Sequence, residues 1–311
     1  MNPRTVEAVI DAAGKHWDLA NDIEITLEAN PGSVEAGRFA DYRTAGVNRV
    51  SVGIQALNDK DLKRLGRLHS ADDGKRALAT ADQVFDRFSF DLIYARQDQS
   101  LDDWHSELSA AIRIGADHMS LYQLTIEDGT AFGTLFKHGK LAGMPDEDLG
   151  ADMYDLTQDM MHEAGYRAYE VSNHAREGAE SKHNQIYWDA GDWIGIGPGA
   201  HGRLTIRGER HATETALSPN GWLDAVAKGS GELQRTRLSP EDASGEYLMM
   251  GLRTETGVEF DRISSLLNTD FMNKIIHLTY IDLIETQDNH LKTTAKGRPI
   301  LNAIVRDLLP D

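Results

Sequence analysis

The stretch Arg49-Val50-Ser51-Val52-Gly53-Ile54-Gln55 decides the fold class of this 311-residue chain. Its valines and isoleucine predict a β-strand, and similar apolar runs occur at residues 23–28, 88–94 and 118–125. Longer helical patterns lie between these runs, and one of them opens with the capping pair Ser70 and Asp73. Strands that alternate with helices are typical of βαβ units, so we predict an α/β fold built on a parallel sheet.

The second half of the chain predicts a smaller, helical module. A helical pattern at residues 146–165 precedes a strand-like run at 193–196. We place the domain boundary after residue 232, which gives domains at residues 1–232 and 233–311. The segment Ser239-Pro240-Glu241-Asp242 combines a capping serine, a proline and two acids, which predict a helix start. Two more helical patterns and a β-hairpin that turns at Asp288-Asn289 indicate a winged-helix-like module.

The composition excludes several classes of function. With 32 basic and 50 acidic residues the net charge is −18, so the field repels nucleic acid. The C-terminal module is therefore expected to pack or to dock a partner rather than DNA. The chain contains no cysteine, which excludes disulfides, thiolate zinc sites, cysteine nucleophiles and iron–sulfur clusters held by its own thiolates. No apolar run approaches the roughly 20 residues that span a bilayer, and no secretory signal opens the sequence, so we expect a soluble, cytoplasmic protein.

Polar residues stand where the predicted strands end. They are Glu28, Gln55, Asp91 and the run Tyr122-Gln123-Leu124-Thr125. Ligand groups of parallel sheets lie just past the carboxyl ends of the strands, because helix N-termini and free backbone amides converge there. A lone carboxylate in such a place is more often a helix cap or a surface ion pair. Together, the four positions favour a small-molecule ligand without defining its class.

A second cluster follows a loop-like segment at residues 173–182. It places an imidazole, a phenol and an indole within six residues, at His183, Tyr187 and Trp188. Imidazole and phenolate are both axial ligands of heme iron, and aromatic rings can stack on a porphyrin. The alternative, a buried aromatic with a hydrogen-bonded histidine that anchors the loop, has about equal weight. The glycine-rich run at 197–202 either admits a ligand close to the backbone or turns a tight corner.

Taken together, these strings resemble the heme-chaperone (HemW) branch of the coproporphyrinogen oxidase-like radical SAM family. Examples are Leu27-Glu28-Ala29-Asn30-Pro31-Gly32 and the string that joins His183-Asn184 to Tyr187-Trp188. The latter favours the heme-chaperone branch over true coproporphyrinogen dehydrogenases. The matching motifs follow the family's order over nearly the whole chain, at residues 27–32, 46–55, 65–67, 91–94, 121–127, 169–173, 183–188 and 195–202.

The resemblance implies a partial (β/α)6 radical SAM-type barrel, which in the family holds a [4Fe-4S] cluster and S-adenosyl-L-methionine, followed by a C-terminal helical module. By position, the SAM-contacting residues of the family match Glu28, Gln55, Arg67 and Asp91, with Thr125 and His201 as further candidates. Carboxylates and an amide suit ribose hydroxyls and an amino group, while an arginine suits a carboxylate. His183 and Tyr187 match the motif associated with heme contact.

Three functions are compatible with this resemblance. The first is a heme carrier that delivers heme to respiratory membrane proteins, at or near the inner membrane. The alternative is an oxygen-independent coproporphyrinogen III oxidase-like radical SAM enzyme of porphyrin biosynthesis. The third is a cofactor-free barrel with a partner-docking module. Heme titration separates the first from the third.

The chain departs from the family's pattern in three places. The cluster motif CxxxCxxC and the glycine motif GGGTPS are missing, because Met1 aligns just after the second of them; we therefore expect an N-terminally truncated barrel that lacks its first strands. Where relatives have Pro-Gly before Gln, this chain has Arg96-Gln97-Asp98-Gln99. Cluster iron needs thiolates, so we expect heme to be the one family cofactor that this chain can bind, and radical catalysis is not expected. An exposed sheet edge would also favour a homodimer.

Overall fold

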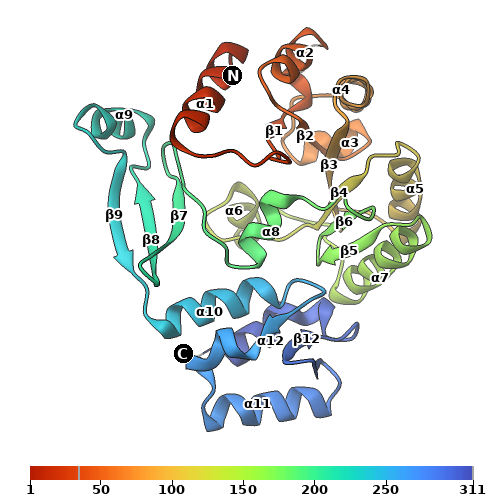
Figure 1. Cartoon of the computed structure of the whole chain (residues 1–311). Helices are drawn as coiled ribbons and strands as arrows, with labels where there is room; N and C mark the ends of the chain where they lie inside the picture. Colours follow the sequence, from red (N-terminus) through yellow and green to blue (C-terminus); the bar gives the residue numbers. More distant parts are fainter. Residues whose placement is uncertain (34–35, 310–311) are drawn as a thin grey trace. The chain divides into compact units, whose positions relative to one another are not determined.

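The computed structural model describes residues 1–33 and 36–309, which form two compact units, Met1–Glu180 and Ser181–Asp311 (Figure 1). The first unit contains the predicted parallel sheet, and the second contains the helical C-terminal segment. The domain boundary predicted between residues 232 and 233 falls inside a strand of the second unit, and it stays a prediction.

A six-stranded sheet is the centre of the first unit. Its order is β1-β2-β3-β4-β6-β5, in which the first four strands run parallel and β6 runs antiparallel to both β4 and β5. The four strands predicted for this sheet are present, and the predicted run at 49–55 matches β2 residue for residue. The strands are β1 (Thr26–Ala29), β2 (Arg49–Gln55), β3 (Arg87–Tyr94), β4 (His118–Gln123), β5 (Arg167–Glu170) and β6 (Asn173–Ala175).

Side-chain caps fix where the helices of this unit begin. The capping box predicted at Ser70 and Asp73 is present, because each side chain bonds the backbone N–H of the other residue. The long helix predicted at 146–165 is also present, with Asp146 as its N-cap. The helices are α1 (Pro3–His16), η1 (Pro31–Ser33), α2 (Ala36–Thr44), α3 (Asp59–Arg64), α4 (Ala71–Val84), α5 (Leu101–Ile112), α6 (Ala131–Lys137) and α7 (Glu147–Glu163).

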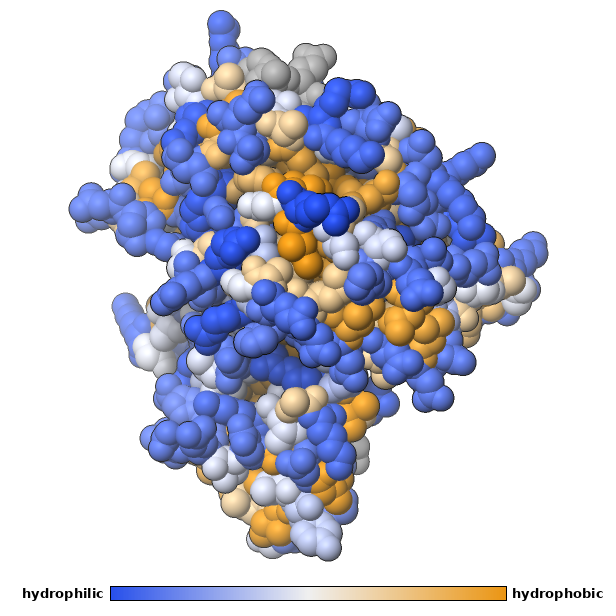
Figure 2. Space-filling model, turned by 90° about the vertical axis from the view of Figure 1, so that its right-hand side faces the viewer, coloured by the Kyte–Doolittle hydropathy of each residue, from blue (hydrophilic) through white to orange (hydrophobic). Residues whose placement is uncertain are grey.

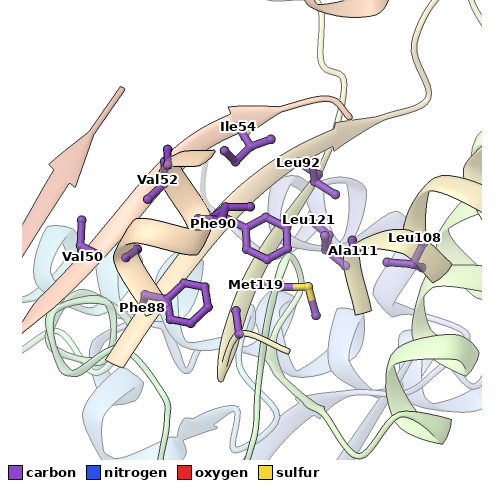
Figure 3. Packing of buried hydrophobic residues seen from close by; sticks show 14 of the residues in the cluster. Val50, Val52, Ile54, Phe88, Phe90, Leu92, Leu108, Ala111, Met119 and Leu121 are labelled. Carbon is purple, nitrogen blue, oxygen red and sulfur yellow. The ribbon is translucent and has the colours of Figure 1, made fainter. Parts of the chain in front are cut away.

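The central strands have one apolar and one polar face, because successive side chains of a strand point to opposite sides. Val50, Val52 and Ile54 of β2 lie on the same side as Phe90 of β3 and Leu121 of β4 (Figure 3). All five are almost completely buried, and residues of α4, α5 and α7 belong to the same cluster. The helices therefore cover this face, whereas the opposite face of the same strands is polar.

The second unit begins with a helix and an antiparallel sheet that the sequence did not predict. The strands of this sheet are rich in charged residues and threonine and are largely exposed, so they lack a clear apolar alternation. The elements are α8 (Lys182–Trp188), β7 (His201–Ile206), β8 (Glu209–Thr215), α9 (Pro219–Ala227) and β9 (Glu232–Arg237), and the sheet order is β7-β8-β9.

The strand predicted at residues 193–196 is wrong. Only one isolated bridge, from Trp193 to Arg203, forms in this segment, and Ile194 and Ile196 are exposed. A Cβ atom on Gly195 would lie 2.3 Å from the carbonyl oxygen of His201, so the segment runs tightly against the start of β7. The apolar residues here therefore face solvent instead of filling a core.

The C-terminal part of this unit confirms the predicted hairpin. β11 and β12 pair antiparallel around Asp288 and Asn289, whose φ angles of 49° and 65° fit a type I′ turn. β10 pairs with the other edge of β12. The elements are α10 (Pro240–Gly251), β10 (Val258–Glu259), η2 (Phe260–Leu266), α11 (Thr269–Tyr280), β11 (Ile284–Gln287), β12 (His290–Thr293), η3 (Arg298–Ile300) and α12 (Leu301–Leu308).

The surface is largely polar on the face drawn in Figure 2. Patches of apolar side chains interrupt this face. Within residues 1–33 and 36–309, none of the helices combines the length and the apolar character that crossing a bilayer requires.

The apolar face of the sheet should dominate the stability of the first unit. We expect Phe90→Ala to lower the free energy of unfolding by about 3–5 kcal/mol, because Phe90 is fully buried and its removal leaves a cavity. Leu68→Ala, at a fully exposed position, is the matched control and should change stability by less than about 0.5 kcal/mol. Urea unfolding followed by circular dichroism measures both; equal effects would contradict this assignment of the core.

Candidate functional site

The polar face of the first sheet brings three of the predicted site residues together. Glu28 on β1 lies level with Ser51 on β2, and Asp91 on β3 lies level with Ser120 on β4. The Asp91 carboxylate lies within hydrogen-bonding reach of the side chains of Ser120 and Ser51, and it interacts electrostatically with Glu28. Two carboxylates and two hydroxyls therefore occupy neighbouring strands on one face.

Gln55 joins this group through an irregular strand end. Its φ angle is 71°, and the β2–β3 register shifts between Val52 and Gln55. A Cβ atom on Gly53 would lie 3.1 Å from Gln55 Nε2 and 3.9 Å from Asn30 Oδ1. The amide of Gln55 therefore lies over Gly53 and beside Asn30, and the absence of a side chain at Gly53 leaves room for it.

Burial makes Asp91 the most perturbed carboxylate of this face. Burial raises its pKa from 3.8 to about 6, and the negative charge of Glu28 acts in the same direction. The hydroxyl groups of Ser120 and Ser51 and the guanidinium of Arg49 oppose this shift. Asp91 therefore changes its protonation state near neutral pH, as residues of ligand sites often do.

Arg67 and Thr125 lie at the same end of the sheet without joining the cluster. Arg67 lies in the turn that follows α3. In the same turn, the imidazole of His69 forms a 3.1 Å hydrogen bond with the carbonyl of Ile54, near the end of β2. Thr125 is exposed two residues past β4, and its hydroxyl donates to the Gln123 carbonyl. Within the described part of the chain, no hydrogen bond or ion pair links either side chain to Asp91.

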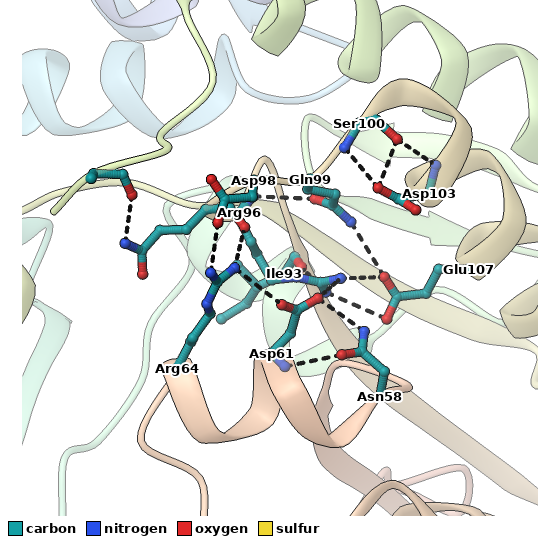
Figure 4. A network of polar contacts seen from close by, with 12 residues as sticks. Asn58, Asp61, Arg64, Ile93, Arg96, Asp98, Gln99, Ser100, Asp103 and Glu107 are labelled. Atoms are coloured by element: carbon teal, nitrogen blue, oxygen red, sulfur yellow. Dashed lines mark hydrogen bonds and ion pairs between the residues drawn. The ribbon is translucent and has the colours of Figure 1, made fainter.

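A buried ion-pair network holds the loops that follow β2 and β3 (Figure 4). Arg96 pairs with Glu107 of α5 and with Asp61 of α3, at 3.0 Å from the latter, and it donates to the Ile93 carbonyl. Glu107 also accepts the backbone N–H of Leu57 at 2.6 Å. Arg96 and Glu107 are almost completely buried. The segment Arg96–Gln99, which differs from the family's pattern, is therefore held in place by buried ion pairs.

The second predicted cluster lies in the second unit. The segment from His183 to Trp188 lies in the helix α8, capped by the hydroxyl of Ser181, and the loop-like segment predicted before it contains the strand β6. The His183 and Tyr187 rings are 4.8 Å apart in an edge-on arrangement, and the Tyr187 and Trp193 rings are 4.5 Å apart. An imidazole, a phenol and the indole of Trp193 therefore form one row, whereas the predicted indole of Trp188 contacts the Arg253 guanidinium instead. Burial raises the pKa of Tyr187.

Exposed isoleucines occur on the segments that carry this aromatic row. Ile186, Ile194 and Ile196 are 42%, 50% and 72% exposed, which is unusual for isoleucine. His201 is exposed at the start of β7, and its carbonyl accepts the indole N–H of Trp193 at 3.2 Å. The backbone of His201 thus contacts Trp193 in the second unit, and the predicted role of its side chain at a SAM site stays a prediction.

Several polar groups of the sheet were missed in the sequence analysis. Ser51, Ser120 and Asn173 line the same face as Asp91, and Ser120 donates to the Asn173 side chain at 3.0 Å. Arg49 also lies on this face. The signal was present in the sequence, because these residues alternate with the apolar positions of β2 and β4.

The raised pKa of Asp91 predicts a pH-dependent effect of Asp91→Asn. The folded state holds the proton more tightly than the unfolded chain, so the buried charge destabilises the fold increasingly as pH rises from 3.8 to about 6. We expect Asp91→Asn to stabilise the chain by about 1–2 kcal/mol at pH 7.5 and by almost nothing at pH 4, as measured by urea unfolding. Asp11→Asn, at an exposed position, should have no such effect; the same gain at both pH values for Asp91→Asn would contradict the assignment.

Comparisons with known proteins agree with this architecture. The model of the Radical SAM superfamily matches residues 1–109. The mitochondrial radical S-adenosyl methionine domain-containing protein 1 of Bos taurus is 43% identical over 83% of this chain, and the chain spans 59% of that relative's length. The heme chaperone HemW of Haemophilus influenzae is 35% identical, with coverage of 96% of this chain and 76% of the relative.

A solved structure shows the same fold. Coproporphyrinogen III oxidase (HemN) from Escherichia coli, described as a radical SAM enzyme, superimposes with a TM-score of 0.80 at 17% identity, covering 99% of this chain and 75% of that chain. The mixed α/β fold is therefore of the radical SAM type over the whole chain. On these similarities, the chain belongs to the family that contains the heme chaperone HemW and the mitochondrial radical S-adenosyl methionine domain-containing protein 1, within the radical SAM superfamily.

Proposed function

We propose that this chain binds heme at the aromatic row of α8 and passes it to other proteins, with respiratory membrane proteins as the recipients. The observation that carries the proposal is the row of His183, Tyr187 and Trp193 among exposed isoleucines. A porphyrin needs an apolar surface for its ring and a ligand for its iron, and this cluster offers both. The relatives named as heme chaperones support the same assignment.

His183 is the better iron ligand of the two candidates. Burial raises the pKa of Tyr187, so its phenol keeps its proton at neutral pH and is a poor ligand. The imidazole of His183 is exposed and lies one helical turn away, on the same side of α8. In this proposal, His183 binds the iron and Tyr187 packs its ring against the porphyrin.

The family's other cofactors fit this chain to different degrees. A [4Fe-4S] cluster does not fit, because the 311 residues contain no thiolate. The carboxylates of Glu28 and Asp91 and the amide of Gln55 could hold the hydroxyl and amino groups of S-adenosyl-L-methionine, with Arg67 and Thr125 nearby. These residues alone support no radical step, since the iron–sulfur cluster that would reduce S-adenosyl-L-methionine has no thiolate ligands in this chain.

The proposal includes a finer description of the fold. The four parallel strands with their helices correspond to a partial (β/α)6 barrel. The C-terminal order of α10, β10, η2, α11 and the β11–β12 hairpin corresponds to a winged-helix-like module. Such a module in an acidic chain suits protein docking better than DNA binding.

Heme titration tests the main proposal. We expect hemin to produce a saturable shift of the Soret band, and we expect His183→Ala to lose it or to weaken binding at least about tenfold. Tyr187→Phe should retain iron ligation with a smaller loss of affinity, and His105→Ala, an exposed histidine on α5, is the control. A parent chain without a Soret shift, or a shift unchanged in His183→Ala with Tyr187→Phe, would end the proposal.

The alternative, a coproporphyrinogen III oxidase-like radical SAM enzyme, is favoured by the shared face of Glu28, Gln55 and Asp91. It requires a cluster, so anaerobic reconstitution with iron and sulfide discriminates between the two. We expect less than about 0.1 cluster per chain, because thiolates are the ligands that these clusters need. About four irons and four sulfides bound per chain would favour the enzyme instead.

A further inference from the structure

Arg49 is a buried cation on the polar face of the first sheet. It opens β2 and is only 5% exposed. Its guanidinium donates to the Ser89 hydroxyl at 2.8 Å and to the Thr26 hydroxyl at 3.4 Å. Both partners are neutral, and Arg49 forms no ion pair within the residues that the structure describes.

Such an arrangement is costly for a structural residue. A guanidinium stays protonated in proteins, and it has five N–H groups, of which hydroxyls occupy only a part here. Buried charges are normally paired with an opposite charge, because hydroxyl partners recover little of the lost hydration. Burial lowers the pKa of Arg49, which confirms that the site disfavours the charge it carries.

The neighbouring carboxylates leave Arg49 without an ion pair of its own. Glu24 and Asp91 both attract Arg49, but neither forms an ion pair with it among the described residues, and Glu24 already pairs with Arg87 at 3.0 Å. His118 adds no charge, because burial and the two arginines hold its pKa well below its usual range.

His118 also leaves a polar atom unused. Its Nε2 shares a 2.7 Å hydrogen bond with the Tyr169 hydroxyl. Its Nδ1 is buried and, among the described residues, has no hydrogen-bond partner. An unused polar atom next to a buried guanidinium that has only hydroxyl hydrogen-bond partners is expected of a ligand site rather than of a finished core.

We propose that Arg49 binds the carboxylate group of a small organic molecule on the polar face of this sheet. A guanidinium matches a carboxylate with two parallel N–H···O bonds, and the hydroxyls of Ser89 and Thr26 lie beside it. Asp91 also interacts with Arg49, so a singly charged carboxylate is favoured over a doubly charged phosphate. Thr26 and Ser51, on the same face, are half-buried and so retain contact with solvent.

This site is independent of the proposed heme site. Arg49 belongs to the first unit, whereas His183 and Tyr187 belong to the second. The two proposals can therefore fail separately: loss of the Soret shift would not affect the carboxylate site, and loss of carboxylate binding would not affect heme ligation.

Thermal unfolding with sodium propionate tests the proposal, with sodium chloride keeping the ionic strength constant. We expect a saturable rise in Tm of about 2–4 °C in the parent chain and none in Arg49→Met. Arg43→Met, which removes a surface arginine paired with Asp86, is the matched control and should retain the rise. Equal responses of the parent chain and Arg49→Met, or no response of the parent chain, would overturn the proposal.

Two further measurements keep the test decisive. Should Arg49→Met fail to fold, arginine side-chain NMR of the parent chain replaces it; the Nε–Hε signal of Arg49 should then shift with propionate, and an unmoved signal would refute binding. Phosphate serves as the competing anion. A larger Arg49-dependent rise in Tm with phosphate than with propionate would contradict the carboxylate assignment.

Discussion

The alternation of side chains along β2, β3 and β4 is the constraint on which the first unit depends. One face must be apolar enough to hold the helices, so Val50, Val52 and Phe90 are fully buried there. The same geometry fixes the residues between them on the opposite face, where Ser51 and Asp91 lie. A shift of one residue in the register of β2 would bury the polar set and expose the apolar set. Core and site therefore share one structural cause.

The carboxyl ends of the strands need further interactions to hold them, because the backbone there departs from the regular β-sheet hydrogen-bonding pattern. Gln55 has a positive φ angle, and so has Ala95, which follows the end of β3. The buried pair of Arg96 and Glu107 holds the loops after β2 and β3, since Arg96 follows β3 and Glu107 also accepts the backbone N–H of Leu57 after β2. Removing one partner of a buried pair is strongly destabilising, whereas an apolar replacement of both is often tolerated. The pair thus acts on the position of the loops, and through them on Gln55, rather than on a ligand directly.

The regular part of the fold could be predicted from the sequence, and the irregular part could not. β2 follows from its own residues, and the turn at Asp288-Asn289 follows from the preference of these residues for positive φ. The segment around Ile194 was misread, because exposed isoleucines have the same pattern as a buried strand. Glu28 and Asp91 lie on one face of the sheet, although Asp91 stands three residues before the end of β3, and their role at a ligand site stays a prediction. The network of Arg96 was not foreseen, since an ion pair between residues distant in sequence leaves no local pattern.

The two units divide the chemistry of this chain between different kinds of groups. The first unit offers carboxylates, hydroxyls and the guanidinium of Arg49 on a partly open sheet, which suits a small polar molecule. The second offers aromatic rings, exposed isoleucines and the imidazole of His183, which suits a large flat apolar ligand with a metal at its centre. Neither surface can replace the other, because an apolar ring would leave Asp91 and Arg49 without hydration or partners. The proposed heme site uses an imidazole and aromatic rings and needs no thiolate, whereas an iron–sulfur cluster needs thiolates that these 311 residues do not contain.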